Sequence, residues 1–183
     1  MTTSGAGGGL ILVGGGVRSG KSALALRLAR ARAAEVTFVA TAQAFDDEMA
    51  ARIARHRAER DAAFHTVEEP LDLPGVLLRE RGVVLVDCLT LWLSNLLCRG
   101  DTDAAVEGAF DRLEAALAGR GAAAILVSNE VGLGIVPESA LARRFRDLAG
   151  TLHRRLAARA DEVYLAAMGL CLRLKPSSLT VDV

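Results

Sequence analysis

The 183-residue chain has the length of one compact domain, and its 51% hydrophobic content is enough to form a single buried core. Its 22 lysines and arginines are balanced by 22 aspartates and glutamates, so the sequence lacks the basic excess that favours binding to a nucleic-acid backbone. Three widely spaced cysteines without a CxxC pair argue against a disulfide framework or a zinc site, and we expect reduced, mostly buried thiols at Cys88, Cys98 and Cys171.

Short apolar runs alternate along the chain with longer stretches that have helical spacing and charged outer faces. The runs predicted as buried strands are 10–13, 36–40, 83–87, 122–128 and 162–168. The stretches predicted as helices are 21–33, 46–60, 103–119 and 138–160. Residues 64–69 fit a short extra strand, and residues 170–175 alternate like a final antiparallel strand. This alternation predicts an α/β domain with a central, mostly parallel sheet flanked by helices.

A glycine-rich segment follows the first predicted strand. Residues 15–22, GGVRSGKS, fit the pattern G-x-x-x-x-G-K-[ST] and open the first predicted helix, which is where a phosphate-binding loop (P-loop) must lie. Its glycines allow backbone N–H groups to turn towards phosphate oxygens, and the helix N-terminus adds a positive dipole end. The predicted nucleotide contacts are Gly15, Gly16, Val17, Arg18, Ser19, Gly20, Lys21 and Ser22. The alternative is a chance glycine turn between a strand and a helix.

Within this loop, Lys21 is predicted to act as a catalytic residue that holds the β- and γ-phosphates, and Ser22 to ligate Mg²⁺. Asp87 ends a buried run and is the predicted second metal ligand, although it also fits an N-cap of the helix that begins near Leu89. The substrate expected at this site is therefore a nucleoside triphosphate. Because P-loops serve kinases, switches and motors alike, the motif alone does not fix the function.

The chain ends and the longest apolar stretch indicate how the protein is organised. Residues 1–9 are small and polar without a basic segment, which predicts a flexible leader instead of a signal peptide. Residues 83–98 are interrupted by Asp87 and other polar positions, so we expect no membrane span and a cytoplasmic protein. The expected organisation is a single RecA-like P-loop catalytic domain over residues 10–176, followed by a tail over residues 177–183.

A histidine among arginines is the second unusual feature. In the predicted helix 46–60, Met49 and Ile53 fall on the buried face, while His56 lies beside several arginines on a neighbouring face. Nearby positive charges disfavour the imidazolium, and a neutral imidazole can attack phosphorus. On composition alone, a solvated helix face that contains one histidine is the preferred interpretation. His65 and His153 are expected to be structural or solvent-facing and receive no role.

Several segments together resemble one family. They are GGVRSGKS, ATAQAFDDEMAARIARHR, SNEVGLGIVPESALARRFRDLAG and LAARADEVYL, which occur in the family's order over most of the chain. The chain resembles the bifunctional adenosylcobinamide kinase/adenosylcobinamide-phosphate guanylyltransferase enzymes of cobalamin biosynthesis. The resemblance implies phosphorylation of the aminopropanol hydroxyl of adenosylcobinamide, followed by transfer of GMP from GTP with release of pyrophosphate. It also implies that His56 is the residue that carries GMP covalently, which reverses the preference stated above.

Further site residues are implied by the same resemblance. The nucleotide contacts outside the P-loop would be Ala40, Thr41, Ala42, Arg57, Ala58, Glu59, Arg60, Glu68 and Asp87. A carboxylate can accept the guanine N1–H and N2–H₂ donors, and whether Glu68 or Asp87 does so is open. The chain departs from the family where Arg55 replaces one of two adjacent histidines of some members, and where Asp87 replaces a glutamate.

The resemblance also implies ATP and GTP as substrates, Mg²⁺ as cofactor, adenosylcobinamide as the corrinoid partner, and a homotrimer with shared sites. No nucleic-acid partner is expected. The alternatives are a monofunctional P-loop kinase for a small molecule and, in another class, a nucleotide-driven switch or motor. The absence of an NKxD segment argues against a GTPase switch, and the short chain without a basic nucleic-acid face argues against a motor. The loop NEVGLGIVP places Asn129 and Glu130 near nucleotide, corrinoid or a neighbouring subunit, or else forms a rigid turn.

Overall fold

The computed structural model describes residues 9–44, 46–58 and 62–177. Over these residues the chain forms one seven-stranded sheet of order β3-β2-β4-β5-β1-β6-β7, in which β7 runs antiparallel to β6 and the other neighbours are parallel. The strands are β1 (Leu10–Gly15), β2 (Val36–Ala40), β3 (Phe64–Glu68), β4 (Val83–Asp87), β5 (Ala124–Asn129), β6 (Glu162–Ala167) and β7 (Leu170–Lys175). The helices are α1 (Lys21–Arg30), α2 (Asp47–Ala58), α3 (Leu73–Arg79), α4 (Leu89–Arg99), α5 (Asp103–Ala118) and α6 (Ala140–Arg159).

This architecture confirms the predicted fold class, including the short strand at 64–69, which is β3, and the final antiparallel strand, which is β7. The sequence prediction missed α3, because seven residues are too few to show a helical period. Local chemistry nevertheless starts this helix: Asp72 caps it by accepting a hydrogen bond from Gly75 N at 3.0 Å, and Pro74 lies in its first turn.

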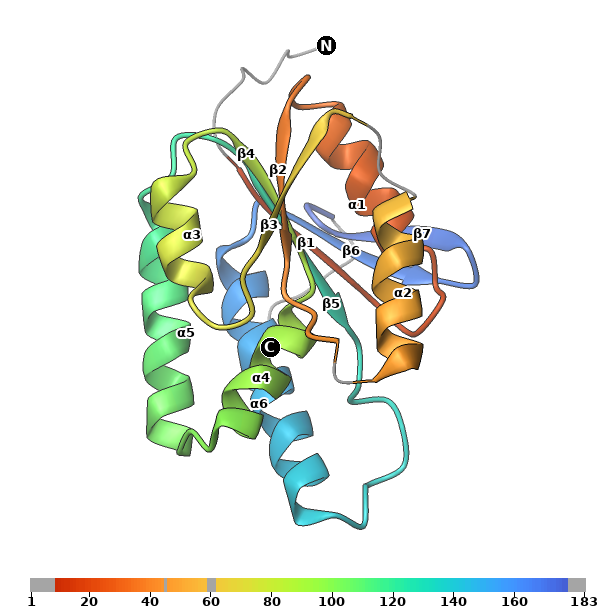
Figure 1. The fold of residues 1–183 in the computed structure, drawn as a ribbon, viewed down its shortest axis with the longest axis vertical. Helices are drawn as coiled ribbons and strands as arrows, with labels where there is room; N and C mark the ends of the chain where they lie inside the picture. The colour runs from red at the N-terminus through yellow and green to blue at the C-terminus, as the bar shows by residue number, and fades with distance from the viewer. Residues whose placement is uncertain (1–8, 45, 59–61, 178–183) are drawn as a thin grey trace.

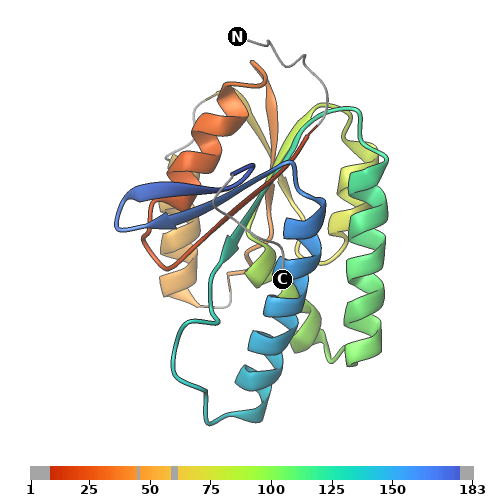
Figure 2. The same ribbon diagram turned by 180° about the vertical axis from the view of Figure 1, so that it is seen from behind.

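The helices cover both faces of the sheet. Figures 1 and 2 show α1 and α2 on one face and α3, α4, α5 and α6 on the other. The alternation along β1 reflects these two layers, since Leu12 packs into the α3–α6 side whereas Ile11 and Val13 pack into the α1 side. The larger core holds the fully buried Trp92 against Phe110, with ring centroids 6.1 Å apart. Both faces of the central strands are therefore dry, which explains their continuous apolar runs.

The apolar stretch 83–98 turns out to be β4 followed by α4. Most of its side chains, among them Leu89, Trp92 and Leu93, are buried inside the domain, which accounts for their hydrophobicity. None of the helices in the described part of the chain is long and apolar enough to cross a membrane. The expectation of mostly buried thiols is wrong, because Cys98 and Cys171 are exposed and Cys88 alone is buried.

Candidate nucleotide site

The P-loop connects β1 to α1 in the way its sequence predicts. The chain turns at Arg18 (φ 55°) and Gly20 (φ 94°), and α1 begins at Lys21. Gly15 lies where another chain segment approaches closely: a Cβ on it would be 2.4 Å from Ala166 O of β6 and 2.7 Å from Ser19 Oγ. The loop is thus folded tightly against β6, and glycine is required at position 15.

Two polar groups inside this loop fit a bound anion. Lys21 is only 7% exposed and its Nζ donates to Gly16 O at 3.1 Å, so a positive charge is held under the loop. Ser19 Oγ is buried and makes no hydrogen bond to any residue that the structure describes. An unsatisfied buried hydroxyl is costly unless a ligand pairs with it, and a phosphate oxygen can do so. The described geometry therefore fits the predicted triphosphate grip.

The two neighbouring glycines make a matched test of this cradle. Gly15→Ala should abolish nucleotide binding and lower the free energy of unfolding by about 1–3 kcal/mol, because backbone oxygen of β6 must move to admit the methyl group. Gly16→Ala should leave stability nearly unchanged, since nothing lies within 4 Å of a Cβ there. Urea unfolding and equilibrium dialysis with GTP measure both effects. Equal stability and equal GTP affinity in the two variants would contradict the close approach of Ala166 O to Gly15.

The register of the strands places the two predicted acidic residues, Glu68 and Asp87, at the same edge of the sheet. Ala40 is paired with Glu68 on one side and with Asp87 on the other, and Gly15 is paired with Asn129. These positions end parallel strands, so all of them lie along the carboxyl edge of the sheet, where ligands bind in α/β proteins. The structure thus brings together residues that are far apart in the sequence.

Asp87 is not the N-cap residue of α4, so that alternative is wrong: the N-cap position is occupied by Cys88, whose side chain makes no capping hydrogen bond. Thr41, predicted to line the nucleotide site, is fully buried and ties the ends of β2 and β4 together. Its hydroxyl donates to Cys88 O at 2.7 Å and accepts from Cys88 N at 2.9 Å. Burial raises the pKa of the Cys88 thiol, which is therefore neutral at pH 7.

The residues present fit a magnesium ion held mainly by a nucleotide. Ser22 is half-buried in the first turn of α1, and α1 packs against β4, which ends at Asp87. Among the described residues no group of three or more His, Cys, Asp or Glu side chains could hold a metal by itself. Mg²⁺ typically takes one or two protein oxygens and completes its octahedron with phosphate and water, so one hydroxyl and one carboxylate suffice.

α2 carries the predicted histidine. His56 lies in the last turn of this helix, and its side chain, like those of Arg52 and Ala58, is outside the described part of the structure, as are residues Glu59 and Arg60. Asp46 accepts from Met49 N at 2.7 Å at the start of the helix. Among the described side chains of α2, Met49 and Ile53 are half-buried and the others are exposed. This agrees with the prediction that Met49 and Ile53 fall on the inner face of the helix.

Two predicted nucleotide contacts, Arg57 of α2 and Glu68 of β3, form an ion pair with each other. The two side chains are 60% and 61% exposed, and ion pairs with this degree of exposure contribute little to stability. Both groups are therefore available to a ligand at small cost.

A polar cluster beyond β5 was not predicted from the sequence. His153 of α6 is half-buried, with its Nε2 2.6 Å from Ser128 Oγ and its Nδ1 3.7 Å from Glu130 Oε2. The order Ser–His–Glu is that of a hydrolase triad, but Ser128 is 1% exposed within the strand, where no substrate can reach it. The cluster is therefore not a hydrolase triad, and the half-buried position of His153 agrees with the structural role expected for it. The sequence does contain a signal that His153 is not fully exposed, because it lies close to Leu152 and Leu156 on α6, and both leucines are buried.

Asn129 lies between this cluster and the P-loop. Its Nδ2 donates to Thr90 Oγ1 at 2.9 Å, while its Oδ1 is buried and unpaired in the described structure. The next residue, Glu130, donates its backbone N–H to Gly15 O at 3.0 Å. The loop that follows β5 is therefore attached directly to the start of the P-loop.

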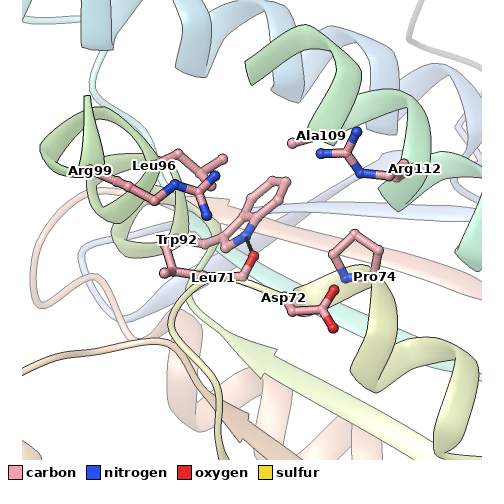
Figure 3. A pocket seen from close by; sticks show the side chains of 8 residues that line it. All are labelled: Leu71, Asp72, Pro74, Trp92, Leu96, Arg99, Ala109 and Arg112. Atoms are coloured by element: carbon pink, nitrogen blue, oxygen red, sulfur yellow. Dashed lines mark hydrogen bonds between the residues drawn. The ribbon is translucent and has the colours of Figure 1, made fainter. Parts of the chain in front are cut away.

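A small cavity of about 140 Å³ between α3, α4 and α5 is separate from this site (Figure 3). The indole N–H of Trp92 donates to Leu71 O at 2.8 Å in its wall, and Arg99 and Arg112 also line it. The residues that line this cavity include neither the P-loop nor the strand ends at the carboxyl edge of the sheet.

The tightly folded glycine loop, with its buried lysine beside a parallel sheet edge, places the chain in the class of RecA-like P-loop nucleotide-binding proteins. The flagellar accessory protein FlaH of Methanocaldococcus jannaschii has a similar fold, with a TM-score of 0.51 and 16% identity over 90% of this chain and 75% of that chain. Within this class, residues 11–174 match the family described as cobinamide kinase / cobinamide phosphate guanyltransferase, and the chain belongs to that family.

Curated relatives agree with this assignment. The bifunctional adenosylcobalamin biosynthesis protein CobP of Pseudomonas aeruginosa is 47% identical, and the alignment covers 92% of this chain and 98% of that protein. The bifunctional adenosylcobalamin biosynthesis protein CobU of Escherichia coli is 42% identical, and its counterpart in Salmonella typhimurium is 44% identical, each over 91% of this chain and 99% of the relative. The family resemblance stated from the sequence motifs is confirmed.

Proposed function

We propose that this chain phosphorylates adenosylcobinamide with a nucleoside triphosphate and then transfers GMP from GTP to the product through a covalent intermediate on His56. The family match supports both activities. The observation that carries the proposal is the P-loop itself, in which Lys21 is buried and the Ser19 hydroxyl makes no hydrogen bond to any residue that the structure describes. ATP and GTP are the proposed nucleotide substrates.

In the kinase reaction, the P-loop positions the triphosphate and Lys21 neutralises charge on the γ-phosphoryl group. The substrate hydroxyl attacks the γ-phosphorus, the bond from that phosphorus to the bridging oxygen breaks, the nucleoside diphosphate leaves, and the hydroxyl proton is released to solvent. Mg²⁺, when held by Ser22, Asp87 and the phosphates, supplies further charge neutralisation. Because there is little covalent chemistry for the protein to perform, positioning and electrostatics account for most of the rate.

In the guanylyl transfer, a neutral ring nitrogen of His56 attacks the α-phosphorus of GTP. A nitrogen–phosphorus bond forms, the α–β bridging bond breaks, and pyrophosphate leaves towards the P-loop. A phosphate oxygen of adenosylcobinamide phosphate then attacks the same phosphorus and displaces the imidazole, which gives adenosylcobinamide-GDP. The two halves of this reaction are separable, so a ping-pong pattern is expected.

We infer that α2 moves when GTP binds. The described side chains of this helix are exposed or half-buried, so its docking on the domain involves little buried apolar surface. The exposed Arg57–Glu68 pair is weak enough to exchange for nucleotide contacts. In that exchange Glu68 would accept the N1–H and N2–H₂ groups of guanine, or Asp87 would do so, while Arg57 turns to the phosphates.

We also infer a cytoplasmic homotrimer with sites between subunits, built on a catalytic domain over residues 10–176. Three exposed apolar side chains on the β6–β7 hairpin, Met168, Leu170 and Leu172, support subunit contact at this place. The hairpin turn touches the P-loop, since Gly169 N donates to Ser19 O at 3.2 Å. A subunit docked there would lie next to the nucleotide.

The covalent step is tested by isotope exchange without corrinoid. The wild-type protein, incubated with unlabelled GTP, Mg²⁺ and ³²P-pyrophosphate, should form labelled GTP, because the histidine intermediate forms and reverses before any acceptor binds. ATP in place of GTP is the control for base selectivity and should exchange much more slowly.

A wild-type protein that phosphorylates adenosylcobinamide but catalyses no exchange would contradict the covalent route. That outcome would leave a monofunctional kinase or a direct transfer between bound substrates. Activity of neither kind would remove the proposal as a whole.

A further inference from the structure

A second and larger cavity, of about 550 Å³, lies between the loop that follows β5 and helix α6. It adjoins the nucleotide site, because Glu130 in its wall donates a backbone hydrogen bond to Gly15 O of the P-loop. The side chains that line it are Glu130, Arg146, Asp147, Thr151, His153 and Arg154.

Arg146 has hydrogen-bonding capacity in this cavity that the described residues do not use. Its Nη2 donates to Gly132 O at 2.7 Å and so anchors the loop, whereas its Nη1 is buried and has no partner in the described structure. A buried N–H group without an acceptor is costly, and a ligand oxygen would relieve that cost. The guanidinium is thus a preformed donor on one wall.

Glu130 supplies an acceptor to the same cavity. One carboxylate oxygen accepts from Gly132 N, and the other lies 3.7 Å from His153 Nδ1. Burial lowers the pKa of His153, so this ring is neutral at pH 7 and leaves the carboxylate uncompensated by it. A carboxylate has about four acceptor positions, so capacity for ligand N–H groups remains.

The charges that line the cavity indicate what kind of ligand fits. Two carboxylates, Glu130 and Asp147, balance two guanidinium groups, Arg146 and Arg154. The lining of the cavity therefore carries no net charge that would attract a free anion, whereas the P-loop has the positive charge of Lys21. Paired donors and acceptors suit neutral carboxamide groups, which carry one carbonyl acceptor and two N–H donors each.

The rim beside the cavity is apolar. Leu133, Ile135 and Val136 of the same loop are 88%, 96% and 65% exposed, which is unusual for three large apolar side chains within four residues. The ligand that fits both surfaces is large, apolar over one face and fringed with carboxamides. A corrinoid ring has this chemistry, whereas a nucleotide does not.

We propose that the cavity between the loop after β5 and α6 binds the carboxamide fringe of the corrinoid substrate, with Arg146 and Glu130 as the paired donor and acceptor. The apolar loop side chains lie against the macrocycle, and the aminopropanol arm reaches the P-loop past Glu130. This assignment rests on the proposed function, because it names where the acceptor of that reaction binds.

Two variants test it by steady-state kinetics. Arg146→Gln removes the unpaired donor, and Glu130→Gln removes the carboxylate while keeping an oxygen that can accept from Gly132 N. Each should raise the KM for adenosylcobinamide about tenfold or more, as expected for loss of a hydrogen bond to a charged group. The KM for ATP and the GTP–pyrophosphate exchange rate should stay within about twofold of wild type. Arg112→Gln, in the cavity of Figure 3, is the matched control and should change none of these values.

Equilibrium dialysis with adenosylcobinamide, followed by its visible absorbance, should show the same loss of affinity. Unchanged corrinoid affinity in both variants would sink the assignment, and so would a parallel fall in pyrophosphate exchange, which would place these residues in the nucleotide site. A changed sedimentation coefficient together with the loss would identify the surface as a subunit contact and overturn the assignment. If the wild type does not phosphorylate adenosylcobinamide, the proposed function itself fails, and the assignment with it.

Discussion

Lys21→Ala should lower kcat/KM for phosphorylation of adenosylcobinamide by about 10²–10³-fold, the usual effect of removing one preorganised donor from a transition state. Lys21 is almost fully buried under the P-loop. A cation from solvent therefore cannot take the place of its ammonium group during the reaction. The same substitution should reduce GTP–pyrophosphate exchange, because both reactions use one triphosphate grip.

The matched control is Lys175→Ala, which alters the other lysine of the sequence. Lys175 Nζ donates to Ala157 O and Ala158 O near the end of α6, where it contributes to stability but touches no P-loop residue. Initial rates for both reactions and a thermal unfolding curve separate the two variants. Phosphorylation that persists in Lys21→Ala would remove the P-loop from the mechanism.

His56→Ala should abolish covalent labelling of the protein by GTP labelled on its α-phosphate, while phosphorylation of adenosylcobinamide stays within a few-fold of wild type. The reason is chemical: the kinase step needs no protein nucleophile, whereas the guanylyl transfer proceeds through a phosphorus–nitrogen bond. The label on the wild type should be labile in acid and stable in alkali, as a phosphoramidate is.

His65→Ala is the control for this experiment, since His65 is exposed on β3 and has no proposed role. This variant should be labelled as strongly as the wild type. Labelling that survives in His56→Ala would place the nucleophile elsewhere and would remove α2 from the guanylyl transfer. Loss of both activities in His56→Ala would instead show that the helix contributes to the shared triphosphate site.

The P-loop could be read from sequence because its function is local. Eight consecutive residues supply the turn, the cation and the helix start, and glycine at position 15 is dictated by the close approach of Ala166 O. The parallel sheet was also readable, since strands buried on both faces have continuous apolar runs. From those two facts the carboxyl-edge position of Asp87 and Glu68 follows, and the strand register agrees with it.

Other features depended on contacts between distant segments. Thr41 was predicted to contact the nucleotide. In the structure its hydroxyl bonds to the backbone of Cys88, 47 residues further along the chain, and so joins the ends of β2 and β4. Exposure of Cys98 and Cys171 was likewise not predictable from their type, because free cysteine is usually buried and the outcome depends on which helix face or strand edge packs.

The sequence by itself determined the family, the position of the glycine-rich loop between β1 and α1, and the layered fold, because each depends on short-range pattern or on the period of apolar residues. The tertiary structure alone decided that Ser128, Glu130 and His153 meet, and that Arg146 lines the same cavity as Glu130 and His153. Those contacts join β5, its following loop and α6. Only the packing of α6 on the sheet brings them within bonding distance, and no local pattern records how that packing is set.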